Sequence, residues 1–519
     1  MMIDLRGKRV LVMGLGVHGG GLGVARWLLR QGAQVTVTDQ APAERLSASL
    51  AALQQVEQQT GTTVRYVLGR HAAEDFTGHD MLVVNPAVPP DSSWLELART
   101  AGVPIETQMT LFFRRCPGPV IGITGTKGKS TTTLLTGAML RRQFPGTVIA
   151  GNVRASALEA LDRITPTTPV VLELSSFQLV GLGAACLSPQ YAAITNLSPD
   201  HLNYHGSMEE YAAAKRQIYA WQQPGGTVVL NLDDAPSSHF FAAPWPGHLV
   251  GCINWNPRDA SAAQAQRAQL QCWSIPPATL ILRYGEAVYQ KRYDPDVHAS
   301  PAEVPATLRD ADRLFDLAEV QLPGEHNVAN VLTATALAHS FGISSAQIRA
   351  AIRSFAGVEH RLELVAELDG VRYINDTTAT NPAAAQAALE SFAAPLILLA
   401  GGADKHLDPA LFARTIARRV KALVLLAGSA TDRLQQEVRA QGFAQPIAGP
   451  FDDFTVAIRA ARDLAEPGDL VLLSPGCASF GMFHNEFHRG EEFRRIVTGE
   501  LAVNSRQTGT TEDIADNLL

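Results

Sequence analysis

The chain has 519 residues, of which 46% are hydrophobic and 18% charged, and its formal net charge is −7. This length predicts about three domains, each able to bury its own core. A mildly acidic chain without a block of Lys and Arg is a poor candidate for a nucleic-acid partner, because phosphates require basic surfaces. The five scattered cysteines form no CxxC pair, which argues against a disulfide framework and a zinc site.

The N-terminal residues include no apolar stretch typical of a signal peptide. No apolar run approaches the roughly 18 residues needed to span a membrane. We therefore expect a cytoplasmic protein without a membrane partner. The polar segment after Ser505 is expected to be a disordered tail.

Three apolar, strand-like runs are each followed by a glycine-rich turn and a helix pattern. They are Val10–Met13, Val120–Ile123 and Leu396–Ala400. Repeated alternation of strand, glycine turn and helix predicts parallel α/β sheets. We expect an α/β protein of three domains with mostly parallel sheets, comprising residues 1–107, 108–357 and 358–519. The first and last are expected to be Rossmann-like, and the central one P-loop ATPase-like.

Composition marks the joints between these domains and one insertion. The segment Thr107–Pro119 is punctuated by Pro and Gly, and the second joint is placed near Gly357. Segment 255–315 is rich in Ala, Gln, Pro and Asp, and its strand signals are weak apart from Leu280–Tyr284. We interpret it as an elaboration of the central domain.

The sharpest motif runs from Gly122 to Thr131 between a strand-like run and a helix pattern over Thr132–Arg142. Small residues let backbone N–H groups wrap a polyphosphate, and the helix N-terminus adds positive partial charge. Lys129 can reach the β- and γ-phosphates, and Ser130 can bind Mg²⁺. Ile123 replaces the first glycine of the longer P-loop pattern, so this is a shorter form. The residues expected to contact ATP are Thr126, Lys127, Gly128, Lys129, Ser130, Thr131 and Thr132.

Polar side chains end two further strand-like runs. Glu173 follows a buried run, and the segment Ile194–His201 ends in Asp200 and His201. Carboxylates at the C-terminal tips of parallel strands can face a ligand crevice and bind the magnesium of a nucleotide. A surface acid and a structural histidine are the alternative interpretations.

Lys215 lies on the inward face of a predicted helix. Ser207 and Glu210 match a capping box, and Tyr211, Lys215 and Ile218 then fall at i, i+4 and i+7. Loss of solvation lowers the pKa of an inward lysine, and a neutral amine can attack CO₂. A lysine that extends along apolar surface to reach solvent is the alternative.

The first glycine motif, Gly14-Leu-Gly16-Val-His-Gly19, follows a strand-like run, and Asp39 ends the next one. This pattern is typical of a dinucleotide-binding turn. A GxGxxG match by itself is weak evidence for NAD.

Together these segments resemble the Mur ligase family over nearly the whole chain. The loop Gly125–Thr131 resembles its ATP loop, and Leu172–Gln178 and Asn196–His201 resemble its metal-binding strands. The segment Tyr211–Lys215 resembles the helix whose lysine is carbamylated in this family. The resemblance implies catalytic roles for Lys129, Lys215, His201 and Glu173, and a metal site formed by Ser130, Glu173, His201 and Lys215.

Other segments extend the resemblance to the substrates. Asn327 and Asn330 would meet the adenine, Arg361 the phosphates and Asp376 the ribose. The residues implied for the UDP-sugar are Gly14, Gly16, Asp39, Asn85, Asn152 and His201. The segment Ser474–Ser479 resembles the glutamate-adding member, which implies an amino-acid site formed by Thr380, Lys405 and Ser479.

Three departures from the family pattern affect the substrate pockets. Thr378 stands where a lysine is frequent, Glu486 stands where an aromatic residue is common, and the glycine-rich stretch 17–21 is longer than usual. Thr378 cannot supply the charge of that lysine, so either a weaker affinity for glutamate or a substitute cation is expected. Glu486 is expected to face solvent or to pair with Arg489 or His488.

The resemblance implies an ADP-forming ligase of peptidoglycan synthesis that uses ATP and two Mg²⁺ ions to add D-glutamate to UDP-N-acetylmuramoyl-L-alanine. An acyl phosphate would be the intermediate, and a monomer is expected. A ligase adding L-glutamate and a folylpolyglutamate synthase-like ligase are alternatives, although about 107 residues precede the ATP loop. An NAD-binding regulator and a non-catalytic nucleotide-binding scaffold are alternatives from other classes.

Overall fold

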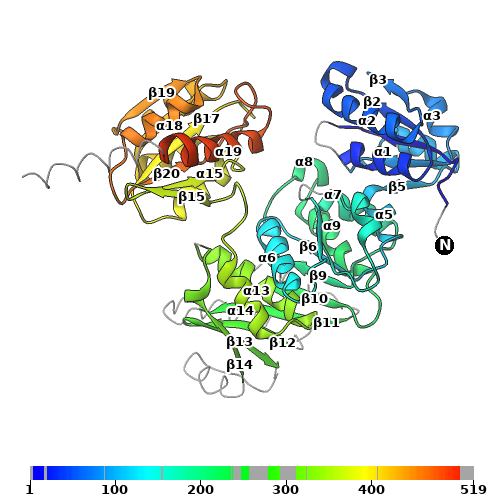
Figure 1. The fold of residues 1–519 in the computed structure, drawn as a ribbon, viewed down its shortest axis with the longest axis horizontal. Helices are drawn as coiled ribbons and strands as arrows, with labels where there is room; N and C mark the ends of the chain where they lie inside the picture. Colours follow the sequence, from blue (N-terminus) through cyan, green and yellow to red (C-terminus); the bar gives the residue numbers. More distant parts are fainter. Residues whose placement is uncertain are drawn as a thin grey trace, which may run out of the picture. The chain divides into compact units, whose positions relative to one another are not determined.

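The computed structural model describes residues 4–16, 20–86, 88–152, 156–234, 236–237, 247–255, 279–292, 311–322, 324–405 and 407–502 (Figure 1). Contacts divide the chain into two compact units, with Met1–Val320 and Glu325–Phe355 in the first and Gln321–Gly324 and Ala356–Leu519 in the second. The second joint, predicted near Gly357, lies beside this division. The division into three domains with the ranges given above stays a prediction. No helix among the described residues is long and apolar enough to cross a membrane.

The first sheet is parallel throughout and has the strand order β3-β2-β1-β4-β5. Its strands are β1 (Arg9–Met13), β2 (Gln34–Asp39), β3 (Arg65–Leu68), β4 (Met81–Val84) and β5 (Ile105–Thr107). Since β1 is central, the turn that follows it opens at the middle of the C-terminal edge. This edge is where parallel sheets bind ligands.

The second sheet, as far as the structure describes it, has nine strands in the order β14-β13-β12-β11-β10-β9-β6-β8-β7. The strands are β6 (Val120–Thr124), β7 (Val148–Gly151), β8 (Val170–Glu173), β9 (Tyr191–Ile194), β10 (Thr227–Asn231), β11 (His248–Trp255), β12 (Thr279–Tyr284), β13 (Ala287–Arg292) and β14 (Asp312–Asp316). The β12–β13 and β13–β14 pairs are antiparallel, and the other pairs are parallel.

The predicted insertion therefore extends the second sheet. Besides β12, which matches the predicted run Leu280–Tyr284, segment 255–315 contributes β13 and the start of β14. The weak strand signals of this segment did not identify β13 and β14 in advance. Residues 256–278 and 293–310 of the insertion, and the predicted tail after Ser505, lie outside the described residues.

The third sheet lies in the second unit and has the order β15-β16-β20-β17-β18-β19. Its strands are β15 (Glu363–Leu368), β16 (Val371–Asn375), β17 (Leu396–Gly401), β18 (Val420–Leu426), β19 (Ile447–Phe451) and β20 (Leu470–Leu473). Only the β15–β16 pair is antiparallel. The three sheets confirm the predicted α/β class with mostly parallel strands.

Helices connect these strands. They are α1 (Gly20–Arg30), η1 (Ala43–Leu46), α2 (Ser47–Thr60), α3 (Ala73–Thr77), α4 (Ser93–Thr100), α5 (Gln108–Phe113), α6 (Lys129–Arg141), η2 (Leu158–Arg163), α7 (Ser176–Ala184), α8 (Leu202–His205), α9 (Met208–Ala220), η3 (Leu317–Glu319), α13 (Glu325–Ser340), α14 (Ser345–Ser354), α15 (Pro382–Glu390), α16 (Ala410–Arg419), α17 (Thr431–Ala440), α18 (Phe454–Asp463), α19 (Glu486–Arg495) and η4 (Ile496–Leu501).

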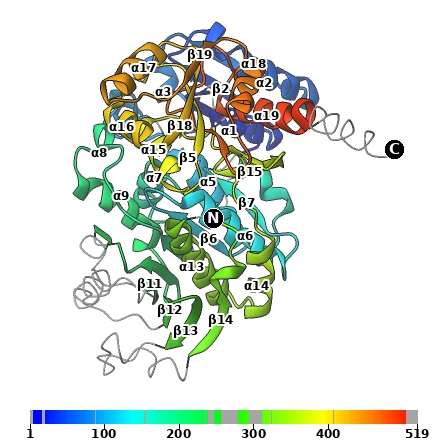
Figure 2. The same cartoon turned by 90° about the vertical axis from the view of Figure 1, so that its left-hand side faces the viewer.

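Alternate residues of β17 and β18 enter separate cores on the two faces of the third sheet. Leu396 and Leu398 pack with buried residues of α15, α16 and α17, whereas Ile397 and Leu399 pack with those of α18, α19 and η4. Figure 2 shows these two helix groups on opposite sides of β18 and β19. A parallel strand covered by helices on both faces must be apolar throughout, which is why Leu396–Ala400 could be read from the sequence.

Candidate active site

The phosphate loop joins β6 to α6 through two glycines that have left-handed or otherwise positive φ angles, 147° at Gly125 and 81° at Gly128. A Cβ at Gly125 would lie 1.9 Å from the Thr195 hydroxyl, and one at Gly128 would lie 2.1 Å from Oδ1 of Asn330. Gly128 is the N-cap of α6 and makes no side-chain cap bond. The first-turn N–H groups of α6 therefore have no capping side chain, as a helix N-terminus that receives an anion requires.

The end of β9 clamps this loop. The Asn196 side chain accepts from the Lys127 N–H at 2.9 Å and donates to the Lys127 carbonyl at 3.0 Å. The Thr195 hydroxyl donates to the same carbonyl at 2.6 Å. The Thr126 hydroxyl donates to the Ser198 carbonyl at 3.1 Å. These bonds fix the loop conformation before any ligand binds, which reduces the entropy that binding must overcome.

The other predicted loop residues differ in accessibility. Lys127 is exposed, whereas Thr131 and Thr132 are buried, and the Thr132 N–H donates to the Gly128 carbonyl within the helix. The helix α6 starts at Lys129, three residues before the predicted start at Thr132, because the phosphate loop ends at Gly128.

Two lysine amines meet at one carbonyl of the loop. Lys129 Nζ donates to the Gly125 carbonyl at 3.0 Å, and Lys215 Nζ donates to the same oxygen at 2.8 Å. Lys215 is only 1% exposed, and its Nζ lies 4.5 Å from the centre of the Tyr211 ring. Burial lowers the pKa of Lys215 well below its ordinary value of 10.5, and the charge of Lys129 lowers it further, against the opposing effect of Asp200.

These observations confirm the inward position predicted for Lys215. Ser207 is the N-cap of α9, and its hydroxyl accepts from the Glu210 N–H at 3.1 Å, as one half of the predicted capping box requires. Tyr211, Lys215 and Ile218 are all buried on one face of this helix. The charged form of the lysine is thereby disfavoured, and the neutral amine is the form that can react with CO₂.

Glu173 links the phosphate loop to the β7 turn. It ends β8 and is 2% exposed. Its Oε2 accepts from the Ser130 hydroxyl at 2.7 Å, and its Oε1 accepts from the Asn152 amide at 3.0 Å. The structure thus brings together a residue predicted for ATP, one predicted for metal and one predicted for the UDP-sugar.

His201 lies apart from this chain of hydrogen bonds. It has a left-handed φ of 52°, its side chain is 48% exposed, and its Nε2 lies 3.5 Å from Asp200. Its ring packs edge-on against Phe177. His205 is buried instead and shares a 2.9 Å hydrogen bond with the Ser176 hydroxyl. Burial lowers the pKa of His205, as do the charges of His201 and Lys215.

Within the described residues, no group of three His, Cys, Asp or Glu side chains is arranged to hold a metal ion. The predicted metal set therefore depends on other oxygen donors. Ser130 and Glu173 supply such oxygens side by side. Lys215 could supply two more only as a carbamate, so the donor set fits Mg²⁺ only with that modification.

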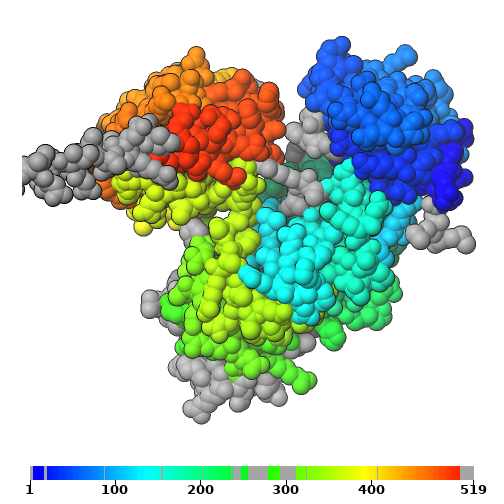
Figure 3. All heavy atoms as spheres, viewed as in Figure 1, coloured from blue at the N-terminus to red at the C-terminus, as the bar shows by residue number. Residues whose placement is uncertain are grey.

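The start of α13 lies against the phosphate loop. Asn327 and Asn330 are buried there, and the Asn330 amide donates to Oδ1 of Asn327 at 3.1 Å. The close approach of Asn330 to Gly128 places these amides beside the first turn of α6. Figure 3 shows the adjoining α6 and α13–α14 segments, in cyan and yellow-green, against each other at the surface.

The glycine turn after β1 is held from three sides. The Gly16 N–H donates to Asp39 at 3.2 Å, the Asn85 amide donates to the Gly14 carbonyl at 3.4 Å, and the Ser49 hydroxyl donates to the Gly16 carbonyl at 3.0 Å. The predicted UDP-side residues Gly14, Gly16, Asp39 and Asn85 thus form one cluster. Residues 17–19 of this motif lie outside the described residues.

In the second unit, Asp376 is buried beneath the loop that carries Arg361. Its carboxylate accepts from the Ser474 hydroxyl at 2.7 Å and from the Leu362 N–H at 3.2 Å. Burial raises the pKa of Asp376 to about 7, while the Ser474 hydrogen bond and the Arg361 charge act in the opposite direction. The two residues predicted for ribose and phosphates are therefore electrostatic neighbours.

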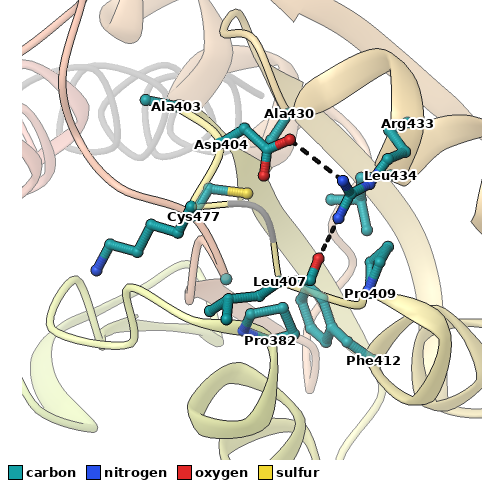
Figure 4. A pocket seen from close by; sticks show the side chains of 12 residues that line it. Pro382, Ala403, Asp404, Leu407, Pro409, Phe412, Ala430, Arg433, Leu434 and Cys477 are labelled. Carbon is teal, nitrogen blue, oxygen red and sulfur yellow. Dashed lines mark hydrogen bonds and ion pairs between the residues drawn. The ribbon is translucent and has the colours of Figure 1, made fainter. Parts of the chain in front are cut away.

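The predicted amino-acid residues lie near a pocket at the C-terminal edge of the third sheet. Lys405 lines this pocket, and its Nζ donates to the Thr380 hydroxyl at 2.9 Å. Ser479 is buried. The Thr378 hydroxyl donates to the His360 carbonyl at 3.0 Å. Figure 4 shows the pocket, with Asp404, Arg433 and Cys477 on its wall.

The buried Arg489 lies beneath this edge. It donates to the hydroxyl and to the carbonyl of Thr377, each at 2.9 Å. Burial lowers the pKa of Arg489 to about 10, whereas the charge of the half-buried Glu486 raises it. Arg489 uses its hydrogen bonds on Thr377, and Glu486 acts on it through its charge, so the expected pairing of Glu486 stays a prediction.

The sequence interpretation missed the roles of several residues. Thr195 and Asn196 clamp the phosphate loop, and the polar end of β9 was the signal that could have identified them. The sequence interpretation placed Tyr211 on the same helix face as Lys215 but predicted no contact between the two, whereas the Lys215 amine lies over the Tyr211 ring. Arg433 had no local signal, because its partners Asp404 and Leu407 lie 29 and 26 positions away.

Three family models match consecutive parts of the chain. They are "Mur ligase MurD-like, N-terminal domain" over residues 8–107, "Mur ligase middle domain" over residues 123–247 and "Mur ligase, glutamate ligase domain" over residues 360–477.

Curated relatives match over nearly their full length. A UDP-N-acetylmuramoylalanine–D-glutamate ligase of Roseiflexus sp. (strain RS-1) is 54% identical, with 95% of this chain and 99% of the relative covered. A protein of the same name from Symbiobacterium thermophilum is 36% identical, with 94% and 98% covered.

Solved structures show the same fold at low identity. UDP-N-acetylmuramate-alanine ligase MurC from Thermotoga maritima has a TM-score of 0.54 and 18% identity, and 95% of this chain and 100% of that chain are covered. A pseudomurein peptide ligase type C from Methanothermus fervidus has a TM-score of 0.51 and 17% identity, with 95% and 99% covered. The models and relatives agree along the whole chain, so this protein belongs to the Mur ligase family, with an N-terminal domain of the MurD-like type.

Proposed function

We propose that this chain is an ATP-dependent, ADP-forming ligase that adds D-glutamate to UDP-N-acetylmuramoyl-L-alanine in peptidoglycan synthesis. The 54% identity to a D-glutamate ligase over 95% of the chain carries the choice of substrate. Membership of the Mur ligase family implies the use of ATP. The uncapped helix N-terminus at Gly128 and the Lys129 amine at Gly125 support a polyphosphate site on their own chemistry.

The proposed reaction has two steps. A carboxylate oxygen of the alanine attacks the γ-phosphorus of ATP, which forms an acyl phosphate and releases ADP. The glutamate amine then attacks the carbonyl carbon, so that a C–N bond forms, the C–O bond to phosphate breaks and the amine loses a proton. Lys129 would neutralise the transferred phosphoryl group. The loop clamp at Asn196 would keep the backbone N–H groups aligned with it.

Magnesium, when bound, would neutralise charge on the phosphates and on the substrate carboxylate. Ser130 and Glu173 would hold one ion through their adjacent oxygens. A carbamate on Lys215, with His201, would hold a second, and this number of ions is part of the proposal. The carbamate would form when the neutral Lys215 amine attacks CO₂ and loses a proton.

The remaining site assignments are part of the same proposal. Asn327 and Asn330 would bind adenine, and Arg361 and Asp376 would bind the phosphates and ribose of ATP. Gly14, Gly16, Asp39, Asn85 and Asn152 would bind the UDP-sugar. Thr380, Lys405 and Ser479 would bind the glutamate carboxylates, because each carboxylate needs a cation or several donors to offset its desolvation. We also propose that the protein is cytoplasmic and monomeric. Sedimentation of the purified protein would test whether it is a monomer.

The deciding experiment measures phosphate release from ATP with UDP-N-acetylmuramoyl-L-alanine and one amino acid at a time. D-glutamate is expected to support turnover, whereas L-glutamate and meso-diaminopimelate at equal concentration are not. A preference for L-glutamate would identify a sister activity, and a preference for diaminopimelate would place the chain in another branch. Turnover with a folate in place of the UDP-sugar would contradict the proposed substrate.

A further inference from the structure

The segment that carries Lys405 spans the end of β17 and the start of α16. It forms one wall of the pocket at the C-terminal edge of the third sheet (Figure 4). The other lining residues are mostly apolar and include Pro382, Pro409, Phe412 and Leu434. Lys405 Nζ reaches Thr380, which follows β16. The position of this one amine therefore depends on how the segment is held.

Arg433 holds the segment on both sides of Lys405. It lies on α17, and its Nη1 donates to Asp404 Oδ2 at 3.2 Å, while its Nη2 donates to the Leu407 carbonyl. Figure 4 shows the guanidinium between these two acceptors. On the N-terminal side, the Asp404 N–H also donates to the Ser429 hydroxyl at 3.0 Å. Asp404, immediately before Lys405, is thus bonded to the β18–α17 connection and to α17. Leu407, two residues after Lys405, is bonded to α17 as well.

The chemistry of this contact favours a geometric role over a stabilising one. The Arg433 side chain is 46% exposed and that of Asp404 is 19% exposed. Ion pairs this exposed contribute little to stability, because water screens them. A guanidinium nevertheless donates from separate nitrogens in a rigid planar fork, whereas a lysine ammonium donates from one atom at the end of a flexible stem. The two hydrogen bonds of Arg433 hold Asp404 and Leu407, one before and one after Lys405.

We propose that Arg433 is a positioning residue for the amino-acid site, and that it aims Lys405 at a substrate carboxylate by holding Asp404 and Leu407, which lie on either side of Lys405 in the sequence. This inference rests on the proposed function, because it takes Lys405 as a ligand of glutamate. Arg433 also lines the pocket, but in this role it acts on the substrate through Lys405. The Thr378 hydroxyl is engaged with the His360 carbonyl, so the proposal assigns the charge that Thr378 lacks to Lys405.

Kinetics of the full-length protein test this role. Arg433→Met keeps the aliphatic stem and removes both hydrogen bonds, and we expect it to raise the KM for D-glutamate about tenfold. The KM values for ATP and the UDP-sugar and the kcat are expected to change less than about twofold. Arg433→Lys should also raise the KM for D-glutamate, because a lysine ammonium lacks the rigid fork that reaches both acceptors from separate nitrogens. Arg418→Met is the matched control, since Arg418 forms an exposed ion pair with Glu390 in the same unit.

A double variant separates positioning from direct binding. With Lys405→Ala already present, Arg433→Met is expected to raise the KM for D-glutamate no further. A further tenfold rise would overturn the proposal, because Arg433 would then act on the substrate without Lys405. An equal rise of all three KM values, or an unchanged KM for D-glutamate, would overturn it as well.

Hydrogen exchange makes the result independent of the substrate. Peptides that cover residues 403–409 should exchange faster in Arg433→Met than in wild type, and Arg418→Met should leave them unchanged. Unchanged exchange in Arg433→Met would overturn the positioning role even if ligation is confirmed. Faster exchange together with wild-type turnover on another amino acid would uphold the positioning of Lys405 and reject D-glutamate as the substrate.

Discussion

At Lys215 the proposed chemistry depends directly on burial, because burial lowers the pKa of the amine. Its amine is 1% exposed and lies beside the amine of Lys129 on one carbonyl. Two ammonium groups that share a buried acceptor repel each other, so one of them is driven toward the neutral form. Carbamylation would replace this repulsion by attraction, because Lys129 would then face a negative group.

We therefore expect Lys215→Ala to be nearly inactive and to recover part of its activity with acetate, which can supply the lost oxygens. Chloride at the same ionic strength is the control and should restore nothing. Phosphate release measures both. Incorporation of ¹³CO₂ into wild type, detected as a carbamate carbonyl resonance by NMR, should be absent in Lys215→Ala. Full activity of the variant without any additive would reject the carbamate.

Asp376 provides a pH-dependent prediction at the same scale. Its pKa is about 7 in the folded chain against an ordinary 3.8. Between these two values the folded state holds a proton that the unfolded state has released, so stability falls as pH rises through this window. The slope cannot exceed about 1.4 kcal/mol per pH unit for one proton.

Asp376→Asn should remove this slope, because the amide does not titrate. Denaturant titrations between pH 4.5 and 7.5, followed by hydrogen exchange in β16 and β20, report on this unit. Wild type is expected to lose stability relative to the variant as pH rises, and the difference should level off above pH 7. Asp452→Asn, at an exposed position, is the control. Parallel pH profiles for wild type and Asp376→Asn would show that Asp376 is ionised throughout.

At the scale of elements, β12 gives the insertion a structural role. Arg283 on β12 is 5% exposed, and its Nη1 donates to Glu325 at 2.6 Å and to the Asn254 side chain at 3.1 Å. Glu325 is the first residue of α13, which carries Asn327 and Asn330. The strand added by the insertion therefore fixes the start of the helix that lies against the phosphate loop.

Arg283→Met is expected to raise the KM for ATP about fivefold while kcat changes little, because the asparagine amides would lose their alignment but the reacting groups would not. Arg313→Met is the matched control, since Arg313 forms a surface ion pair with Asp316 on β14. Steady-state kinetics with ATP as the varied substrate measure both variants. Equal KM values for Arg283→Met and Arg313→Met would mean that β12 only completes the sheet.

The elements differ in how far the sequence predicted them. The runs at β1, β6 and β17 were predicted because central parallel strands are apolar throughout and end in glycine turns. In contrast, β13 carries Gln290, Lys291 and Arg292 near the end of the sheet, where side chains meet water, and such a strand has no clear apolar pattern. The alternation that identifies a strand depends on what covers each face, which is a property of the tertiary structure.

The candidate site divides in the same way. Lys215 and Glu173 were identified from local patterns, an inward helix face and the tip of a strand. The structure joins Glu173 to Ser130 and Asn152, Lys215 to Gly125, and Arg433 to Asp404. These hydrogen bonds link residues 21 to 90 positions apart. No local spacing encodes such pairs. The resemblance to a family supplied the residue roles in place of geometry, and the role of Arg433 required the structure.

At the scale of the whole molecule, the proposed ligands of ATP and of its metal ions are divided between the two units. Lys129, Glu173 and Lys215 belong to the first unit, whereas Arg361 and Asp376 belong to the second. The chain passes between the units at Val320–Gln321, Gly324–Glu325 and Phe355–Ala356. Gly357 follows the last of these and has a φ of 114°, which L side chains rarely adopt. A hinge at this position would let the second unit move as a body.

We expect the second unit to close on the first when a non-hydrolysable ATP analogue and UDP-N-acetylmuramoyl-L-alanine are both present. The physical reason is that an acyl phosphate is hydrolysed by water, so closure that excludes water before the acyl phosphate forms would favour ligation. Small-angle X-ray scattering should show a smaller radius of gyration with both ligands than with neither. Gly357→Val, which disfavours the positive φ, should reduce this compaction and lower kcat, because the hinge would favour other backbone angles. Gly342→Val is the matched control, at a positive-φ glycine between α13 and α14 with open space around it, and it should compact like wild type. Identical scattering profiles with and without the ligands would contradict closure, and a compaction that Gly357→Val leaves unchanged would place the hinge elsewhere.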